Sequence, residues 1–69
     1  MIIKLFNDPI MYRPSYFDWL SMHVGEIESE DNMPDVKTWC WIFNESSFAS
    51  AVYIKNDIDA TAFRLRFGL

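Results

Sequence analysis

The chain has 69 residues, ten acidic side chains against six basic ones, and a formal net charge of −4 at pH 7. That length predicts a single domain over residues 1–69, and because Cys40 is its one cysteine, the core must hold without internal disulfide bonds. The negative charge argues against a protein that grips phosphate backbones, which needs a basic face, so we expect no nucleic-acid partner. The sequence shows no signal peptide and no membrane-spanning stretch, and a lone thiol fits a reducing compartment, so we expect a cytoplasmic protein.

Residues 2–6 predict a short first strand, which ends at the turn residues 7–9 (Asn-Asp-Pro). Because side chains alternate between the two faces of a strand, we expect Ile3 and Leu5 to point inward and Lys4 to lie on the open side. A connecting segment follows, since residues that precede a proline are pushed out of the helical region.

A helix is expected to begin at Ser15. Ser15 and Asp18, three residues on, resemble a capping box, and Gly25 is the expected stop signal. Apolar side chains recur at helical spacing in two adjacent stripes. One consists of Phe17, Leu20 and Val24, with Ile27 as a further candidate, and the other consists of Tyr16, Trp19 and His23.

The segment from Glu26 to Asp35 carries five acidic residues and no basic one, which predicts a solvated loop. It lacks the central glycine and the terminal glutamate of a calcium loop, so we expect no metal site. The segment is the best polar candidate for contact with a basic protein surface.

The stretch Thr38–Ile54 organises the chain, because two runs rich in aromatic and β-branched residues flank a four-residue polar turn. This pattern predicts a β-hairpin in which Phe43 faces Phe48 and Trp39 faces Val52. One face carries the larger side chains and is taken as the core: Trp39, Trp41, Phe43, Phe48, Val52 and Ile54. The other face is expected to stay open: Thr38, Cys40, Ile42, Ala49, Ala51 and Tyr53.

A second helix is predicted after Lys55, with Asn56 or Asp57 as its N-cap and Gly68 as its stop signal. Its apolar residues again form two stripes, one of Ile58, Ala62 and Leu65 and beside it one of Phe63 and Phe67. Arg64 and Arg66 fall in the last turn, where cations suit the helix dipole.

The predicted order is β-α-β-β-α, an α+β fold with a three-stranded sheet. A right-handed crossover leaves room for the third strand between the first two, which gives a ferredoxin-like arrangement that lacks its last strand. Both helices would cover the aromatic face, and the first and second strands would be the free edges of the sheet.

The aromatic strand offers an alternative, a platform on which nucleobases stack, formed by Trp39, Trp41 and Phe43. Such platforms are surrounded by Lys and Arg, whereas here the neighbouring segment is acidic and Lys37 is the nearby base. Core packing is therefore the favoured interpretation.

Catalysis is the other alternative, with His23 as a base toward a Cys40 nucleophile. A nucleophile and its base need hydrogen-bonding proximity and an orienting group, and nothing in the sequence places these two residues together. We expect a non-enzymatic protein with no catalytic residue and no cofactor, in which Cys40 behaves as a small apolar side chain.

The C-terminal helix reads Asp59-Ala60-Thr61-Ala62-Phe63-Arg64-Leu65-Arg66-Phe67-Gly68 and follows an aromatic hairpin. This ending resembles that of many short uncharacterised accessory proteins of tailed bacteriophages, which often read Asp-Ala, two variable residues, Phe, a basic residue, Leu, then an aromatic and a small residue. The resemblance covers about the last thirty residues. It implies a phage origin and a structural motif, with alanine packed closely on the sheet and Phe63 and Leu65 in the core. It carries over no catalytic residue.

Small phage proteins of this size commonly bind and redirect or block a host protein. We therefore expect an accessory protein that binds and modulates or inhibits a host or defence protein in the cytoplasm of an infected bacterial cell. The expected contacts lie on the acidic segment and the open sheet face: Glu26, Glu28, Glu30, Asp31, Ile42 and Tyr53.

Two other functions stay open. One is a small virion component or a structural module that self-assembles through its sheet edges. The other is an oligomer that sequesters a nucleotide messenger between subunits, for which Arg13, Arg64 and Arg66 are the plausible basic set.

Overall fold

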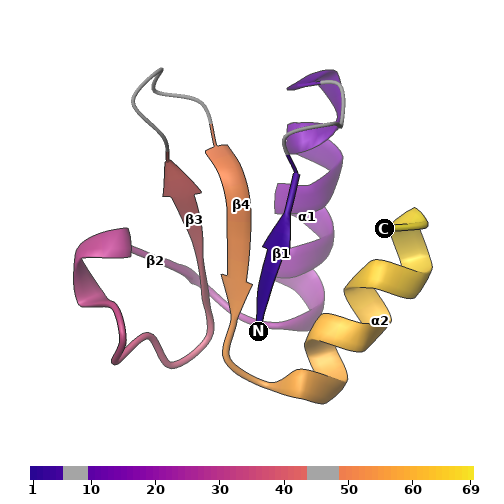
Figure 1. The fold of residues 1–69 in the computed structure, drawn as a ribbon. Helices are drawn as coiled ribbons and strands as arrows, with labels where there is room; N and C mark the ends of the chain where they lie inside the picture. The colour runs from indigo at the N-terminus through magenta and orange to yellow at the C-terminus, as the bar shows by residue number, and fades with distance from the viewer. Residues whose placement is uncertain (6–9, 44–48) are drawn as a thin grey trace.

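The computed structural model describes residues 1–5, 10–43 and 49–69, which form a small α+β structure (Figure 1). Its elements in chain order are β1 (Ile2–Lys4), the 3-10 helix η1 (Ile10–Tyr12), α1 (Arg13–His23), β2 (Ile27–Glu28), the 3-10 helix η2 (Glu30–Asn32), β3 (Trp39–Phe43), β4 (Ala49–Ile54) and α2 (Asp57–Phe67). The strands form one sheet in the order β1-β4-β3-β2. The α+β class is confirmed, and the third predicted strand, now β4, lies between the first two as expected.

The short strand β2 was not predicted, so the expectation of three strands is wrong. β2 runs parallel to β3, with Ile27 opposite Trp39 and Glu28 opposite Cys40. The second predicted strand is therefore not a free edge, because β2 covers part of it. A two-residue strand has no measurable period, and its pairing depends on where β3 lies, so local sequence gives no signal for it.

The hairpin β3–β4 has the predicted faces but a different register. Trp39 lies opposite Ile54, and Trp41 lies opposite Val52, a shift of two residues from the predicted pairing of Trp39 with Val52. A shift of two keeps every side chain on its own face, because side chains alternate with period two. An irregularity follows Ile42, where the register changes within the ladder.

The core lies between the sheet and the two helices. The buried cluster consists of Ile3, Leu5, Tyr16, Leu20, Trp39, Val52, Ile54, Ala60 and Phe63. The inward positions of Ile3 and Leu5 are confirmed, and Trp41 packs against the cluster in part. Phe43 was expected in the core and is 50% exposed, because it follows the register change. Its predicted partner Phe48 lies outside the described residues.

The first helix differs from the prediction at its start and in its buried face. It begins at Arg13, and the side chain of the N-cap residue Tyr12 makes no hydrogen bond to the first turn. The expected capping box at Ser15 is therefore wrong. Tyr16 and Leu20 are buried, whereas Phe17 is 40% exposed. The helix is apolar on two neighbouring stripes, and the packing selects parts of both.

Gly25 ends the first helix, as predicted. The backbone amides of Val24 and Gly25 both donate to the carbonyl oxygen of Leu20, at 2.9 and 3.1 Å. Gly25 has φ +143°, and a Cβ there would lie 2.9 Å from Cγ2 of Thr38, so this position needs glycine.

The second helix has the predicted ends and an unexpected orientation. Asn56 caps it by accepting hydrogen bonds from two backbone amides, and Gly68 ends it in the left-handed conformation. Phe63 is fully buried, but Leu65, expected in the core, is 79% exposed. The core therefore takes the phenylalanine stripe, whose ring centroids lie 5.4 and 4.7 Å from that of Tyr16. The other stripe is exposed to solvent.

The sheet face opposite the helices is partly covered, contrary to the expectation that it is open. Cys40 and Ala51 are buried there, and Val36 is buried outside the helix-side core. The 3-10 helix η2 contacts β3, so the acidic segment packs beside the sheet instead of forming a loose loop. Ile42 and Tyr53 stay partly exposed on this face.

Candidate protein-binding surface

The carboxylate of Glu28 fastens the acidic segment to the start of β3. Its Oε2 atom accepts hydrogen bonds from the backbone amides of Lys37 and Thr38, at 2.9 and 2.7 Å. The Thr38 hydroxyl lies 2.8 Å from the same oxygen and 2.7 Å from the carbonyl oxygen of Glu26, so one proton serves two acceptors. These contacts give Glu28 a structural role within the chain.

The hydrogen bonds stabilise the charged form of the Glu28 carboxyl. The Thr38 hydroxyl makes the largest contribution and the Thr38 amide the next, and together they lower the pKa of Glu28 below its ordinary value of 4.5. Partial desolvation acts in the opposite direction and is outweighed. Glu28 is therefore charged at neutral pH while its oxygen is occupied by the chain itself.

Glu30 acts on the far end of the same strand. Its Oε1 atom accepts a hydrogen bond of 3.1 Å from the backbone amide of Phe43, at the end of β3 beyond the reach of β2. An unpaired amide on a strand edge is a template for pairing with another chain. The Glu30 carboxylate thus satisfies the Phe43 amide, which would otherwise be free to pair, and it holds η2 beside the sheet.

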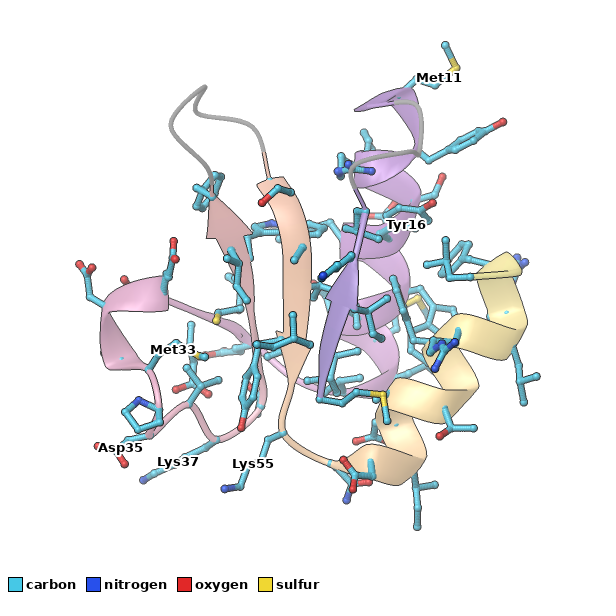
Figure 2. All side chains as sticks on the ribbon, in the orientation of Figure 1. Met11, Tyr16, Met33, Asp35, Lys37 and Lys55 are labelled. Carbon is cyan, nitrogen blue, oxygen red and sulfur yellow. The ribbon has the colours of Figure 1, made fainter. Side chains whose placement is uncertain are left out.

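The remaining acids of the segment are exposed. Glu26, Asp31 and Asp35 point their carboxylates to solvent, and the Ser29 hydroxyl caps η2 by accepting from the Asp31 amide at 3.1 Å. Figure 2 shows Asp35 and Lys37 projecting from the lower edge of the fold. The four predicted acidic contacts therefore divide into two that bind the chain and two, Glu26 and Asp31, that face outward.

The two predicted apolar contacts, Ile42 and Tyr53, lie beside the acidic segment on the half-open sheet face. Ile42 lies on β3 and Tyr53 on β4, and each is partly exposed. Cys40, which lies opposite Tyr53 and two residues before Ile42, is completely buried. Burial is the main reason that the pKa of the Cys40 thiol is raised, and the nearby charges of Glu30 and Glu28 raise it further. Cys40 is therefore a neutral thiol, as expected of a small apolar side chain.

The structure does not bring His23 and Cys40 together. Cys40 faces away from the helices, while His23 is exposed at the end of α1, with its ring 4.6 Å from that of Trp19. The sheet separates them, so this pair makes no nucleophile and base.

The three arginines of the nucleotide hypothesis are engaged in different places. Arg13 donates to the carbonyl oxygens of Ala49 and Leu5, at 3.2 and 3.0 Å. Arg64 donates to the carbonyl oxygen of Leu69 at 3.3 Å, and Arg66 lies over the ring of Phe67. Arg64 lines hollows beside Gly68, and Arg66 lines a different one beside Tyr12, so no described hollow gathers all three.

Some structural contacts carry no sequence signal. Trp39, assigned to the core by pattern, also donates from its Nε1 to the carbonyl oxygen of Gly25 at 2.8 Å. The sequence pattern identifies Thr38 only as a strand residue, and its hydrogen bonds to Glu28 span ten positions of the chain. Aromatic spacing predicts burial, but it gives no partner for a polar atom.

Among the described residues, no group of three or more His, Cys, Asp and Glu side chains is arranged to hold a metal ion. In the same part of the chain, no helix is long and apolar enough to cross a membrane. In comparisons with known proteins, no protein family, curated protein or solved structure matches the chain. The surface beside β3 is therefore interpreted from its own geometry.

Proposed function

We propose that this chain is a non-enzymatic accessory protein, of the kind found in tailed bacteriophages, that binds and modulates a host or defence protein. The binding surface consists of the outward acids Glu26 and Asp31 and the partly exposed apolar residues Ile42 and Tyr53. It is named the acidic surface below. The resemblance of the C-terminal helix to phage accessory proteins supports the phage origin.

One observation carries the proposal. Glu28 and Glu30 bind backbone amides of the chain and thereby hold the acidic segment in one conformation beside the sheet. An ordered segment loses little conformational entropy on binding, which favours affinity. Its outward carboxylates then form a fixed array that complements a basic protein surface.

The neighbouring apolar side chains supply the other half of an interface. Phe43 exposes 50% of its surface at the point where its amide is held by Glu30. Exposed aromatic rings beside charged groups are typical of interface centres, where they are surrounded by a polar rim. Alternation along β3 places Phe43 on the other face from Ile42, so its ring, which the sequence pattern assigns to the core, lies at the edge of the acidic surface.

The experiment is capture of partners from a bacterial lysate by the tagged chain. The double variant Glu26→Lys/Asp31→Lys reverses the outward charges and leaves the hydrogen bonds of Glu28 and Glu30 intact. A matched control, Asp18→Lys/Ser21→Lys/Met22→Lys, raises the net charge equally on exposed positions of α1.

The proposal expects one stoichiometric protein that is retained by the wild type and the control and lost by the acidic-surface variant. A partner that all three baits retain equally would remove the acidic surface from the account. Far-UV circular dichroism of the three proteins verifies that each remains folded.

A further inference from the structure

The outer face of α2 carries a row of exposed apolar side chains. Ile58 is 80% exposed and Leu65 is 79% exposed, and Ala62 lies between them, also exposed. Spacings of four and three residues place these three side chains on one face of the helix. The opposite face, which includes Phe63, is already packed in the core. This α2 stripe therefore has no covering within the described part of the chain.

The α2 stripe has a shape that suits another helix. A shallow apolar hollow on it is lined by Asp57, Ile58, Thr61, Ala62 and Leu65. Its middle positions, Thr61 and Ala62, are small, whereas Ile58 and Leu65 at its two ends are large. Small residues at a crossing point let two helices approach closely, while larger ones fill the spaces on each side.

The charges beside the α2 stripe follow a regular order. Residues seven apart lie on the same side of a helix, so Asp57 and Arg64 flank one side of the stripe, and Asp59 and Arg66 flank the other. Each flank thus has an acid near the N-terminal end of the helix and a base near the C-terminal end.

We propose that the α2 stripe is the contact of a homodimer in which α2 packs antiparallel to α2 of a second copy. In an antiparallel pair with two-fold symmetry, each flank meets the same flank of the other helix. Asp57 then lies near Arg64 of the second copy, and Asp59 lies near Arg66 of the second copy. A parallel pair would set acids beside acids and bases beside bases, and would align the two helix dipoles.

The register of the pair follows from the large side chains. When Ile58 lies opposite Leu65 of the second copy, the two-fold axis passes between Thr61 and Ala62. The small residues then meet at the axis, and each large residue lies over the other copy's large residue. The contact is self-complementary, as a two-fold interface requires.

The dimer leaves the acidic surface accessible. In Figure 1 the segment around β2 and η2 lies beyond β3 on one side of the sheet, and α2 lies on the other side beyond β1. A pair joined through α2 would therefore carry its two acidic surfaces outward and could hold two partner molecules. This inference does not depend on the proposed partner, because its test needs the purified chain alone.

The first test is sedimentation velocity over a concentration series. The wild type is expected to shift from monomer to dimer with concentration, and Leu65→Glu is expected to raise the dimer dissociation constant by at least about tenfold. The control Met22→Glu changes an equally exposed apolar residue on α1, at 80% exposure, and should dimerise like the wild type. A wild type that stays monomeric throughout, or a Leu65→Glu variant that dimerises as strongly, would overturn the proposal.

The second test distinguishes antiparallel from parallel packing by disulfide formation. Ala62→Cys lies beside the two-fold axis and should form a covalent dimer under mild oxidation. In the antiparallel pair, position 58 of one chain lies about 10 Å along the helix axis from position 58 of the second chain. This distance is beyond the reach of a disulfide, so Ile58→Cys should remain reduced. The native Cys40 is completely buried and does not compete.

The cross-linking results distinguish the antiparallel pair from the parallel pair. Selective cross-linking of Ala62→Cys supports the antiparallel pair, whereas efficient cross-linking of Ile58→Cys contradicts it. If the chain is monomeric and Leu65→Glu instead loses a captured partner, the α2 stripe belongs to that partner and the homodimer is wrong.

Discussion

The Glu28 carboxylate accepts hydrogen bonds from both the backbone amide and the hydroxyl of Thr38, at 2.7 and 2.8 Å. The two residues belong to β2 and to the turn that leads into β3, so this contact closes the acidic segment onto the sheet. Because the charged carboxylate accepts stronger hydrogen bonds than the protonated carboxyl group, the strength of this closure depends on pH. The acidic segment is therefore an ordered part of the fold whose stability can be measured by titration.

We expect Glu28→Gln to lower the melting temperature at neutral pH, because the neutral amide accepts weaker hydrogen bonds than the carboxylate. The pKa of Glu28 is lowered in the folded chain from 4.5, so its contribution is fully present above that value and is lost as pH falls through the folded pKa. The difference in melting temperature between the wild type and Glu28→Gln should therefore become smaller at acidic pH. Thermal unfolding from about pH 7 to pH 3 measures it; a difference that is constant across this range would contradict the structural role.

Gly25→Ala should destabilise the fold by about 1–3 kcal/mol, because it forces a side chain into a positive φ and against Thr38. Thr38→Ser removes the Cγ2 atom that the new Cβ would meet at 2.9 Å and keeps the hydroxyl. Adding it to Gly25→Ala should recover part of the loss in chemical denaturation. Gly68→Ala is the control, since nothing lies within 4 Å of its Cβ position, and should cost about 1 kcal/mol. Equal losses for the two alanine variants would contradict the contact.

Phe63→Ala should lower the free energy of unfolding by about 3–5 kcal/mol, which a chain of this size cannot readily tolerate. Phe63 is fully buried among the rings of Tyr16, Trp19 and Phe67. Leu65→Ala, two residues on, should change the unfolding free energy of the dilute chain by no more than about 0.5 kcal/mol. Urea unfolding of both variants tests which face of α2 is buried. A larger loss for Leu65→Ala would reverse the assignment.

Cys40 should be unreactive in the folded chain. The thiol is fully buried and its pKa is raised by that burial and by the charges of Glu30 and Glu28, so the reactive thiolate is scarce. Its reaction with a thiol reagent should be slow in native buffer and become fast when denaturant unfolds the chain. Fast reaction under native conditions would mean that the sheet face above Cys40 is open.

The regular elements follow from the sequence because their signals are local. The aromatic and β-branched runs of Thr38–Ile54 predict the hairpin and its faces, and the residues Asn56 and Gly68 predict the ends of α2. The predicted register differs from the observed one by two residues, because the alternation of side chains fixes the face of each residue but not which residues pair. The extent of the connecting turn decides the pairing.

The wrong predictions of burial arise where the sequence pattern allows two faces of an element to be buried equally well. Both helices are apolar along two stripes, and periodicity gives no reason to bury Phe63 and expose Leu65. Only the packed sheet makes that choice. The division of the acidic segment has a similar cause, because Glu28 and Glu30 bind amides of Thr38 and Phe43 that lie ten and thirteen positions away. The five acids are predicted from the sequence as one exposed group, whereas two of them, Glu28 and Glu30, hold the segment in place.

The central claim is that the acidic surface binds a protein partner, and its most direct test is a calorimetric titration of the captured partner. The wild type, Glu26→Lys/Asp31→Lys and the α1 charge control are compared at low and high salt. The account predicts that the acidic-surface variant loses at least about tenfold in affinity. It also predicts that the control retains wild-type affinity and that added salt weakens the wild-type complex. Equal affinities for all three proteins, or a loss shared equally by the control, would contradict it.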